Sequence, residues 1–189
     1  MKYNPLIHNR QSIRMQGYDY GREGLYFVTF NCQDRIHLFG KITAKKMFLN
    51  EAGTIAQHCW LEIPKHFPHV KLHEFVIMPD HIHGILEITE NVGILESIST
   101  IDGIGFMNQN SGKFSPNFRS PVKTLGSVIR GFKIGVTKWM RQNTDVQKVW
   151  QRGYYDRIIQ DEAEFHRISK YNFENPEKWE EKMRIKENS

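Results

Sequence analysis

The sequence has little of what marks secreted, membrane or disulfide-rich proteins. It contains only two cysteines, Cys32 and Cys59, which do not form a CxxC pair, and this argues against a disulfide framework and against a cysteine-based zinc site. Its longest apolar runs, such as residues 75–78, are far too short to cross a bilayer. The first 15 residues are polar and basic and lack an apolar signal core. We therefore expect a cytoplasmic protein that does not contact membranes.

Length and composition predict a single globular domain over residues 1–189. Hydrophobic residues make up 39% of the chain and charged residues 25%, which is typical of one folded domain. The 26 Lys and Arg against 21 Asp and Glu leave a net charge of +5, a mild preference for a polyanionic partner. Two segments stand apart from the rest: residues 1–24 form a basic N-terminal arm, and residues 90–120, rich in Gly, Ser and Asn, are a long flexible insertion.

The first half of the chain predicts three strands and a helix. Residues 25–32 are rich in aromatic and β-branched side chains, which favours a strand. A helical stripe of apolar residues follows over 43–62, with Thr43 as the expected N-cap. Residues 70–78 and 81–89 are predicted to be antiparallel strands, because Pro79-Asp80 between them is typical of a turn.

The second half predicts a helix, a strand and a final helix. Ser120-Pro121 indicates a helix start, and apolar residues at three- and four-residue spacing from 125 to 140 give that helix one buried face. A fourth strand is expected over 146–159. The final helix should begin at Asp161 and end near Asn175, since Pro176 disfavours helical geometry in the residue before it.

This order of elements predicts an α+β fold of the ferredoxin-like type. The pattern β-α-β-β-α-β forms a four-stranded antiparallel sheet with its two helices on one face. An additional C-terminal helix follows the last strand. The other sheet face is then expected to be open for a partner or a site.

The strongest local motif is Asp80-His81-Ile82-His83-Gly84. Side chains alternate along a strand, so His81 and His83 should point to one face while Ile82 points to the other. Two imidazoles in this arrangement can converge on one divalent ion or one phosphate. An HxH triplet alone is a weak signal, but its place at the start of an apolar strand strengthens it.

The final helix offers a second pair of candidate residues. Tyr171 and Asn175 are four residues apart and therefore share one helical face. A tyrosine hydroxyl can attack phosphorus, and an amide oxygen can bind a hard metal ion. Packing is the alternative role for this stripe. Tyr154 and Tyr155 are rival nucleophiles, although aromatic residues in a strand more often pack or stack.

Together these segments resemble the HUH single-tyrosine transposases, and in particular the REP-associated tyrosine transposases. The resemblance runs over nearly the whole chain. It is carried by the HUH triplet and the late Tyr-x-x-x-Asn-Pro pattern in that order, together with four further segments: 10–20, 26–40, 125–140 and 149–159. Asp80 stands where many relatives have Asn before the triplet.

The resemblance implies the roles of individual residues. His81, His83 and Asn175 would bind Mg²⁺ or Mn²⁺, and Tyr171 would be the catalytic nucleophile. The implied reaction cleaves and rejoins single-stranded DNA that carries hairpins, through a 5′-phosphotyrosine intermediate. A homodimer is also implied. The candidate DNA contacts are Arg10, Arg14, Arg152 and Tyr154.

Two other functions remain open from the sequence. The basic arm and the aromatic strand residues would suffice for a protein that binds hairpin nucleic acid without cleaving it. A relaxase-type nickase is the second alternative, although nickases of that type carry further domains.

Overall fold

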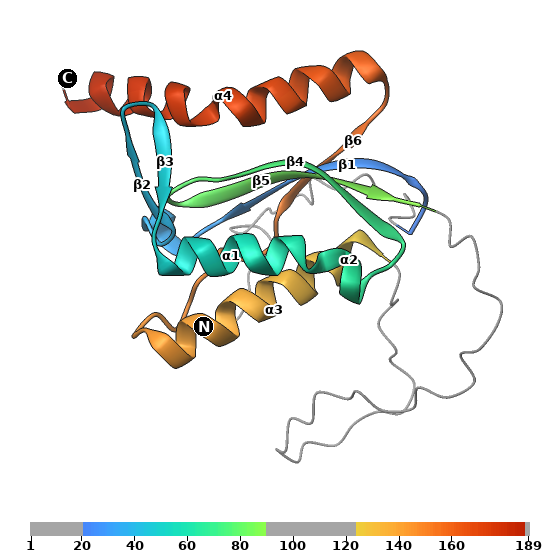
Figure 1. Cartoon of the computed structure of the whole chain (residues 1–189), viewed down its shortest axis with the longest axis horizontal. Coiled ribbons are helices and arrows are strands. Elements are labelled where there is room, and N and C mark those ends of the chain that lie inside the picture. The colour runs from blue at the N-terminus through green and yellow to red at the C-terminus, as the bar shows by residue number, and fades with distance from the viewer. Residues whose placement is uncertain (1–20, 90–123, 188–189) are drawn as a thin grey trace, which may run out of the picture.

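A four-stranded antiparallel sheet lies at the centre of the molecule (Figure 1). We analysed a computed structural model, which describes residues 21–89 and 124–187. The strands stand in the order β4-β5-β1-β6, with every neighbouring pair antiparallel. This order confirms the predicted ferredoxin-like arrangement. The strand bounds are Gly24–Asn31 for β1, Val70–Ile77 for β4, His81–Ile88 for β5 and Tyr155–Ile159 for β6.

Three helices cover one face of this sheet: α1 (Glu51–Leu61), the short α2 (Ile63–His66) and α3 (Leu125–Asn143). The main hydrophobic core lies between them and the sheet. Fully buried Phe30 packs there with Trp60 of α1 and Phe132 of α3, at ring-centroid distances of 5.9 and 5.5 Å. The apolar stripe of α3 is buried as its spacing predicted. Burial of so many aromatic rings is the main source of stability for this layer.

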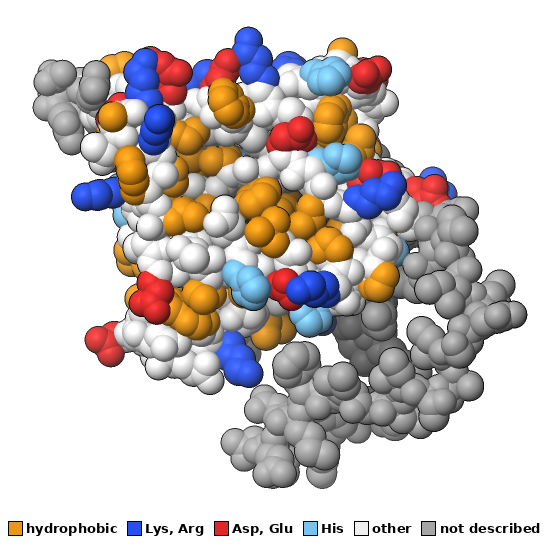
Figure 2. Space-filling model, in the orientation of Figure 1, with side chains coloured by type: hydrophobic (Ala, Val, Ile, Leu, Met, Phe, Trp, Pro, Cys, Tyr) orange, Lys and Arg blue, Asp and Glu red, His pale blue; other side chains and the backbone are white. Residues whose placement is uncertain are grey.

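The opposite face of the sheet is covered by α4 (Glu162–Glu187), which lies across it in Figure 1. A smaller apolar cluster joins Phe27, Ile85 and Ile159 of the sheet to Ile168 of α4. The expectation that this face is open is therefore wrong. The reason is that α4 has apolar residues of its own to bury. In the space-filling view, hydrophobic side chains gather between charged side chains of both signs (Figure 2).

The predicted helix over 43–62 begins too early. Residues 40–49 instead form a hairpin of β2 (Gly40–Thr43) and β3 (Lys46–Leu49). Its two turn residues, Ala44 and Lys45, have φ angles of 50° and 63°, the left-handed conformation that two-residue hairpin turns require. The N-cap of α1 is Asn50, whose Oδ1 accepts a 2.9 Å hydrogen bond from the Gly53 amide. Thr43 therefore ends a strand and caps no helix.

The predicted fourth strand is also too long. Only Tyr155–Ile159 pair with β1, while the chain before them follows an irregular path with Gly153 at a φ of 82°. Lys133 of α3 holds this path in place, because its ammonium group donates to the carbonyls of Gly153 and Gln151 at 2.5 and 3.4 Å.

The final helix begins as predicted, with Asp161 Oδ1 accepting a 2.7 Å hydrogen bond from the Glu164 amide. It does not end near Asn175 but continues through Pro176 to Glu187. The proline removes one helical hydrogen-bond donor. Contacts beyond it offset that loss: the Lys45 amide donates to Glu180 at 3.0 Å, and the Lys45 ammonium pairs with Glu177.

The remaining boundary concerns α3, whose N-cap is Thr124 and not Ser120. The Thr124 and Ser127 side chains cap each other's backbone amides in a capping box. The predicted insertion over 90–120 lies outside the described residues, and so does most of the predicted arm over 1–24.

Candidate functional site

The two histidines of the HxH motif lie side by side on the sheet face that α4 covers. His81 and His83 are each 6% exposed, and their ring centroids are 4.6 Å apart. They are held rigidly because β5 is an inner strand, paired with β1 on one side and β4 on the other. The predicted alternation is confirmed, since Ile82 between them is buried in the core on the opposite face.

Both rings are oriented through their Nδ1 atoms. Thr29 stands opposite His83 in the β1–β5 pairing, and its Oγ1 lies 2.7 Å from His83 Nδ1. The Nδ1 atom of His81 is hydrogen-bonded to the carboxylate of Asp80. This arrangement fixes the ring orientation and leaves both Nε2 atoms as the positions for a ligand.

Charge favours the ionised form of Asp80, and burial favours the neutral form of His83. Burial opposes the ionisation of Asp80, but the hydrogen bond with His81 and the charges of His81, Arg35 and His37 outweigh it and lower the pKa of this carboxyl group. Arg35 lies 3.4 Å from Asp80. Burial, with smaller effects from His81 and Arg35, lowers the pKa of His83 to about 3. His83 is therefore neutral at physiological pH, the form that binds metal ions.

A stripe of α4 lies over the histidine pair. The ring of Tyr171 is 5.4 Å from that of His83, and the ring of Trp179 is 5.4 Å from that of His81. Eight helical residues rise about 12 Å, so Asn175 lies midway between these two contacts. Asn175 is 6% exposed, and its Nδ2 has no hydrogen-bond partner. The structure thus brings together all four residues that the sequence singled out for metal binding and nucleophilic attack.

The residues present fit a metal ion with mixed nitrogen and oxygen ligands. The available groups include two oriented imidazoles and the buried amide of Asn175, whose oxygen would be the ligand atom, and such a set suits a borderline or hard divalent ion such as Mn²⁺. Among the described residues, no three His, Cys, Asp or Glu side chains gather into a metal-binding cluster. The amide oxygen of Asn175 is the candidate for a third protein ligand.

Tyr171 is placed for contact with a substrate. It is 40% exposed, although its ring also packs edge-on against Phe27 at 6.4 Å. The Lys178 ammonium lies 5.9 Å from the centre of the tyrosine ring, and the hydrogen bond to Glu174 raises the pKa of Lys178. A cation near the ring favours negative charge on a phenolic oxygen or on a bound phosphate.

The rival tyrosines are placed less well for chemistry at the histidine pair. Tyr154 lines a groove beside α3, on the other side of the sheet. Tyr155 lies on the same face as the histidines, but its ring packs edge-on against Phe27, with ring centroids 6.5 Å apart. Arg152 is exposed, next to Gly153 of the same groove. Arg10 and Arg14 lie outside the described residues.

Sequence reasoning missed three residues of this site: Thr29, Asn31 and Trp179. Asn31 stands opposite His81 in the β1–β5 pairing, and its Oδ1 is buried without a hydrogen-bond partner. Alternation along β1 places Thr29 and Asn31 on one face, but only the strand register shows that they meet the histidines. Trp179 follows from helical spacing after Tyr171 and Asn175 once the helix is known to continue past Pro176.

The chain was compared with known proteins by sequence. No protein-family model matches it. A Haemophilus influenzae protein, described only as an uncharacterized protein, is 42% identical to it over 180 residues, which cover 95% of each chain. The two chains belong to one family.

A comparison with solved structures identifies the fold of this chain. A solved REP-associated tyrosine transposase, bound to a REP hairpin, aligns with 89% of this chain and 74% of its own length, at a TM-score of 0.55 and 17% sequence identity. This chain therefore has the fold of a REP-associated tyrosine transposase, as the resemblance implied. In the described part of the chain, no helix has the length and hydropathy needed to cross a membrane.

Proposed function

We propose that this protein is a transposase-type enzyme that cleaves and rejoins single-stranded DNA carrying hairpins. The observation that carries the proposal is the position of Tyr171, whose ring packs against one of two buried, oriented histidines. The fold supports it, since a solved structure with that fold is a REP-associated tyrosine transposase bound to a REP hairpin.

The tyrosine carries the proposed chemistry. Its hydroxyl oxygen attacks a phosphodiester, so that a bond from this oxygen to phosphorus forms while the bond to the 3′-oxygen breaks. The products are a 5′-phosphotyrosine and a free 3′-hydroxyl, which takes up the proton lost by the tyrosine. In the reverse step a 3′-hydroxyl attacks the phosphotyrosine and restores a DNA strand. No water or nucleotide is consumed, because the bond energy is kept in the covalent intermediate.

His81, His83 and Asn175 would hold a divalent ion, Mg²⁺ or Mn²⁺, beside the scissile phosphate. When bound, such an ion supplies Lewis-acid polarisation and charge stabilisation at phosphorus. Asp80 and Thr29 orient the two imidazoles through their Nδ1 atoms. The resemblance to dimeric relatives further leads us to propose a homodimer, which light scattering of the purified chain tests directly.

The experiment is a denaturing gel of protein incubated with a labelled hairpin oligonucleotide and Mn²⁺. The wild-type protein is expected to give a covalent band, and Tyr171→Phe is expected to give none while still shifting the DNA in a native gel. Tyr154→Phe and Tyr155→Phe are matched controls, because each removes one hydroxyl group from a rival tyrosine, Tyr154 in the groove beside α3 and Tyr155 against Phe27. An undiminished covalent band from Tyr171→Phe would overturn the assignment.

The same experiment separates the two alternative functions. A protein that only binds hairpins would shift DNA in the native gel and give no covalent band under any divalent ion. A relaxase-type nickase would give a band on strands without hairpins as readily as on strands with them. Finding either pattern would replace the proposal.

A further inference from the structure

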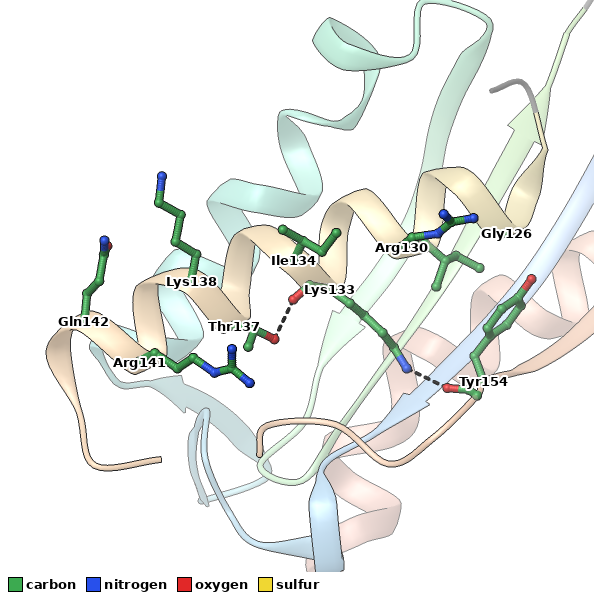
Figure 3. Close-up of a pocket in the computed structure, with 11 residues that line it drawn as sticks. Gly126, Arg130, Lys133, Ile134, Thr137, Lys138, Arg141, Gln142 and Tyr154 are labelled. Atoms are coloured by element: carbon green, nitrogen blue, oxygen red, sulfur yellow. Dashed lines mark hydrogen bonds between the residues drawn. The ribbon is translucent and has the colours of Figure 1, made fainter. Parts of the chain in front are cut away.

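A groove runs along α3 on the side of the sheet away from the histidine pair (Figure 3). It has a volume of about 690 Å³ and is bounded by α3 on one side and by Gly153 and Tyr154 on the other. Lys and Arg side chains line it, and α3 contains no Asp or Glu at all. The candidate catalytic site does not use this groove.

The groove cations form one row along the helix. Arg130, Lys138 and Arg141 are exposed and recur at helical spacing, and eleven residues of α-helix rise about 16 Å. No described carboxylate forms an ion pair with Lys138 or Arg141, and the Arg141 Nε donates only to the Gln147 carbonyl, at 3.2 Å. A row of positive charge with no acidic neighbours on its own helix fits a polyanion.

Lys133 has a different role from these three cations. Its ammonium group donates to the Gly153 and Gln151 carbonyls and lies 5.5 Å from the centre of the Trp150 ring. Burial lowers the pKa of Lys133 to about 8. Lys133 therefore builds the wall of the groove, whereas the side chains of Arg130, Lys138 and Arg141 are exposed on its surface.

The edge strand β6 connects the groove with the candidate catalytic site. Tyr154, just before the strand, lines the groove, whereas Tyr155 lies on the other face against Phe27. The Phe27 ring in turn stacks on His83 at 5.4 Å and packs against Tyr171 at 6.4 Å. Exposed aromatic rings are the surfaces on which unpaired bases stack. A nucleic-acid strand that leaves the groove can thus pass β6 and meet aromatic rings on its way to Tyr171.

We propose that the α3 groove binds the phosphate backbone of a DNA hairpin stem, while the single-stranded flank of that hairpin crosses the β6 edge to Tyr171. This inference rests on the proposed function, because it names where that substrate lies. Each strand of a duplex carries a phosphate about every 3.4 Å of axis, so the row of cations spans about five base pairs. Phosphate contacts of this kind position the DNA and read no sequence.

The test measures the affinity of the full chain for a blunt hairpin stem without flanks, over a range of salt concentrations. The groove variant carries Arg130→Gln, Lys138→Gln and Arg141→Gln and keeps Lys133. Each lost phosphate contact lowers the slope of log K against log salt by about 0.9, so we expect a slope smaller by about 2.7. The matched control makes the same change of charge at three exposed lysines on the other elements: Lys41→Gln, Lys46→Gln and Lys71→Gln.

The proposal predicts that the control keeps the wild-type slope and that the groove variant does not. It is overturned if the two triple variants lose the same slope, since that would show an effect of net charge alone. It is also overturned if the groove substitutions weaken binding of an unpaired oligothymidine, relative to wild type, as much as they weaken binding of the stem, because the groove would then not be specific for a duplex. A second variant, Tyr155→Ala, should weaken binding only to hairpins with a single-stranded flank, and equal weakening on blunt stems would refute the path across β6.

Failure of the proposed function gives a different result from failure of the groove. If no covalent adduct forms with any hairpin but the salt slopes of the two triple variants differ as expected, the groove proposal is supported and the proposed cleavage chemistry is refuted. If the adduct forms through Tyr171 and the groove variant has the same salt slope as the control variant, the proposed chemistry is supported and the stem binds elsewhere.

Discussion

Replacing Asp80 perturbs the candidate metal site without touching a proposed ligand. Asp80 is 4% exposed and accepts the hydrogen bond that orients the His81 ring through its Nδ1. Removing such a partner from a metal-binding histidine costs 10- to 100-fold in metal affinity, which is about 1.4 to 2.7 kcal/mol. We expect a loss of this size for Asp80→Ala. The loss should be smaller for Asp80→Asn, which keeps an acceptor oxygen and gives up only the charge.

The assay is calorimetric titration of the DNA-free protein with Mn²⁺ at pH 7.5. Arg35→Gln is the control, because the Arg35 side chain is 53% exposed and its 3.4 Å ion pair with Asp80 is partly screened by water. Exposed pairs of this kind contribute about 1 kcal/mol or less. The Arg35→Gln variant should therefore bind Mn²⁺ with an affinity within about fivefold of the wild-type value.

Two results would refute this reasoning. The first is wild-type Mn²⁺ affinity in a folded Asp80→Ala protein, which would show that the carboxylate does not orient a ligand. The second is wild-type Mn²⁺ affinity in the double variant His81→Ala and His83→Ala. That result would show that Mn²⁺ does not bind at the histidine pair. Far-UV circular dichroism of each variant shows whether the fold is kept.

Three further predictions concern stability and are measured by urea unfolding of the metal-free protein. Gly84→Ala should lower the free energy of unfolding by about 1 to 3 kcal/mol, because a Cβ there would lie 2.3 Å from the buried Trp60 ring. Asn50→Ala should lower it by about 1 kcal/mol through loss of the α1 cap. Lowering the pH from 7.5 to 5.0 should cost the wild-type protein about 2 kcal/mol more than His83→Gln. The native pKa of His83 is about 3, so stability is lost as the pH falls below about 6.5 and the unfolded chain alone takes up the proton.

Each stability prediction has an outcome that contradicts it. Unchanged stability in Gly84→Ala would mean that Trp60 can move aside at no cost. Wild-type stability in Asn50→Ala would show that packing, and not the Asn50 cap, determines where α1 begins. If wild type and His83→Gln lose the same free energy on acidification, His83 is not held neutral by burial.

The sequence was sufficient for the sheet and for the central residues of the site. Period-two alternation placed His81 and His83 on one face, and helical spacing placed Tyr171 and Asn175 on one stripe. These patterns depend only on local geometry, so they can be predicted without knowledge of the tertiary structure. That the stripe meets the histidine pair was supplied by the resemblance, and the structure agrees with it.

The errors arose where tertiary contacts override local preference. Apolar residues such as Met47 and Leu49 fit a helical stripe as well as a short strand, and the turn at Ala44-Lys45 carries no glycine to mark it. Pro176 is an unfavourable residue inside a helix, yet the helix passes through it because the β2–β3 hairpin holds the segment beyond. Long-range contacts of this kind cannot be predicted from local patterns.

The central claim is that Tyr171 is the residue that becomes linked to DNA, and peptide mapping of the covalent adduct tests it most directly. Trypsin separates the candidates, because Tyr171 falls in the peptide 171–178 whereas Tyr154 and Tyr155 share the peptide 153–157. After incubation with a hairpin oligonucleotide and Mn²⁺, nuclease digestion and mass spectrometry, we predict a nucleotide attached to the peptide 171–178. A nucleotide on the peptide 153–157, with none on 171–178, would contradict the account.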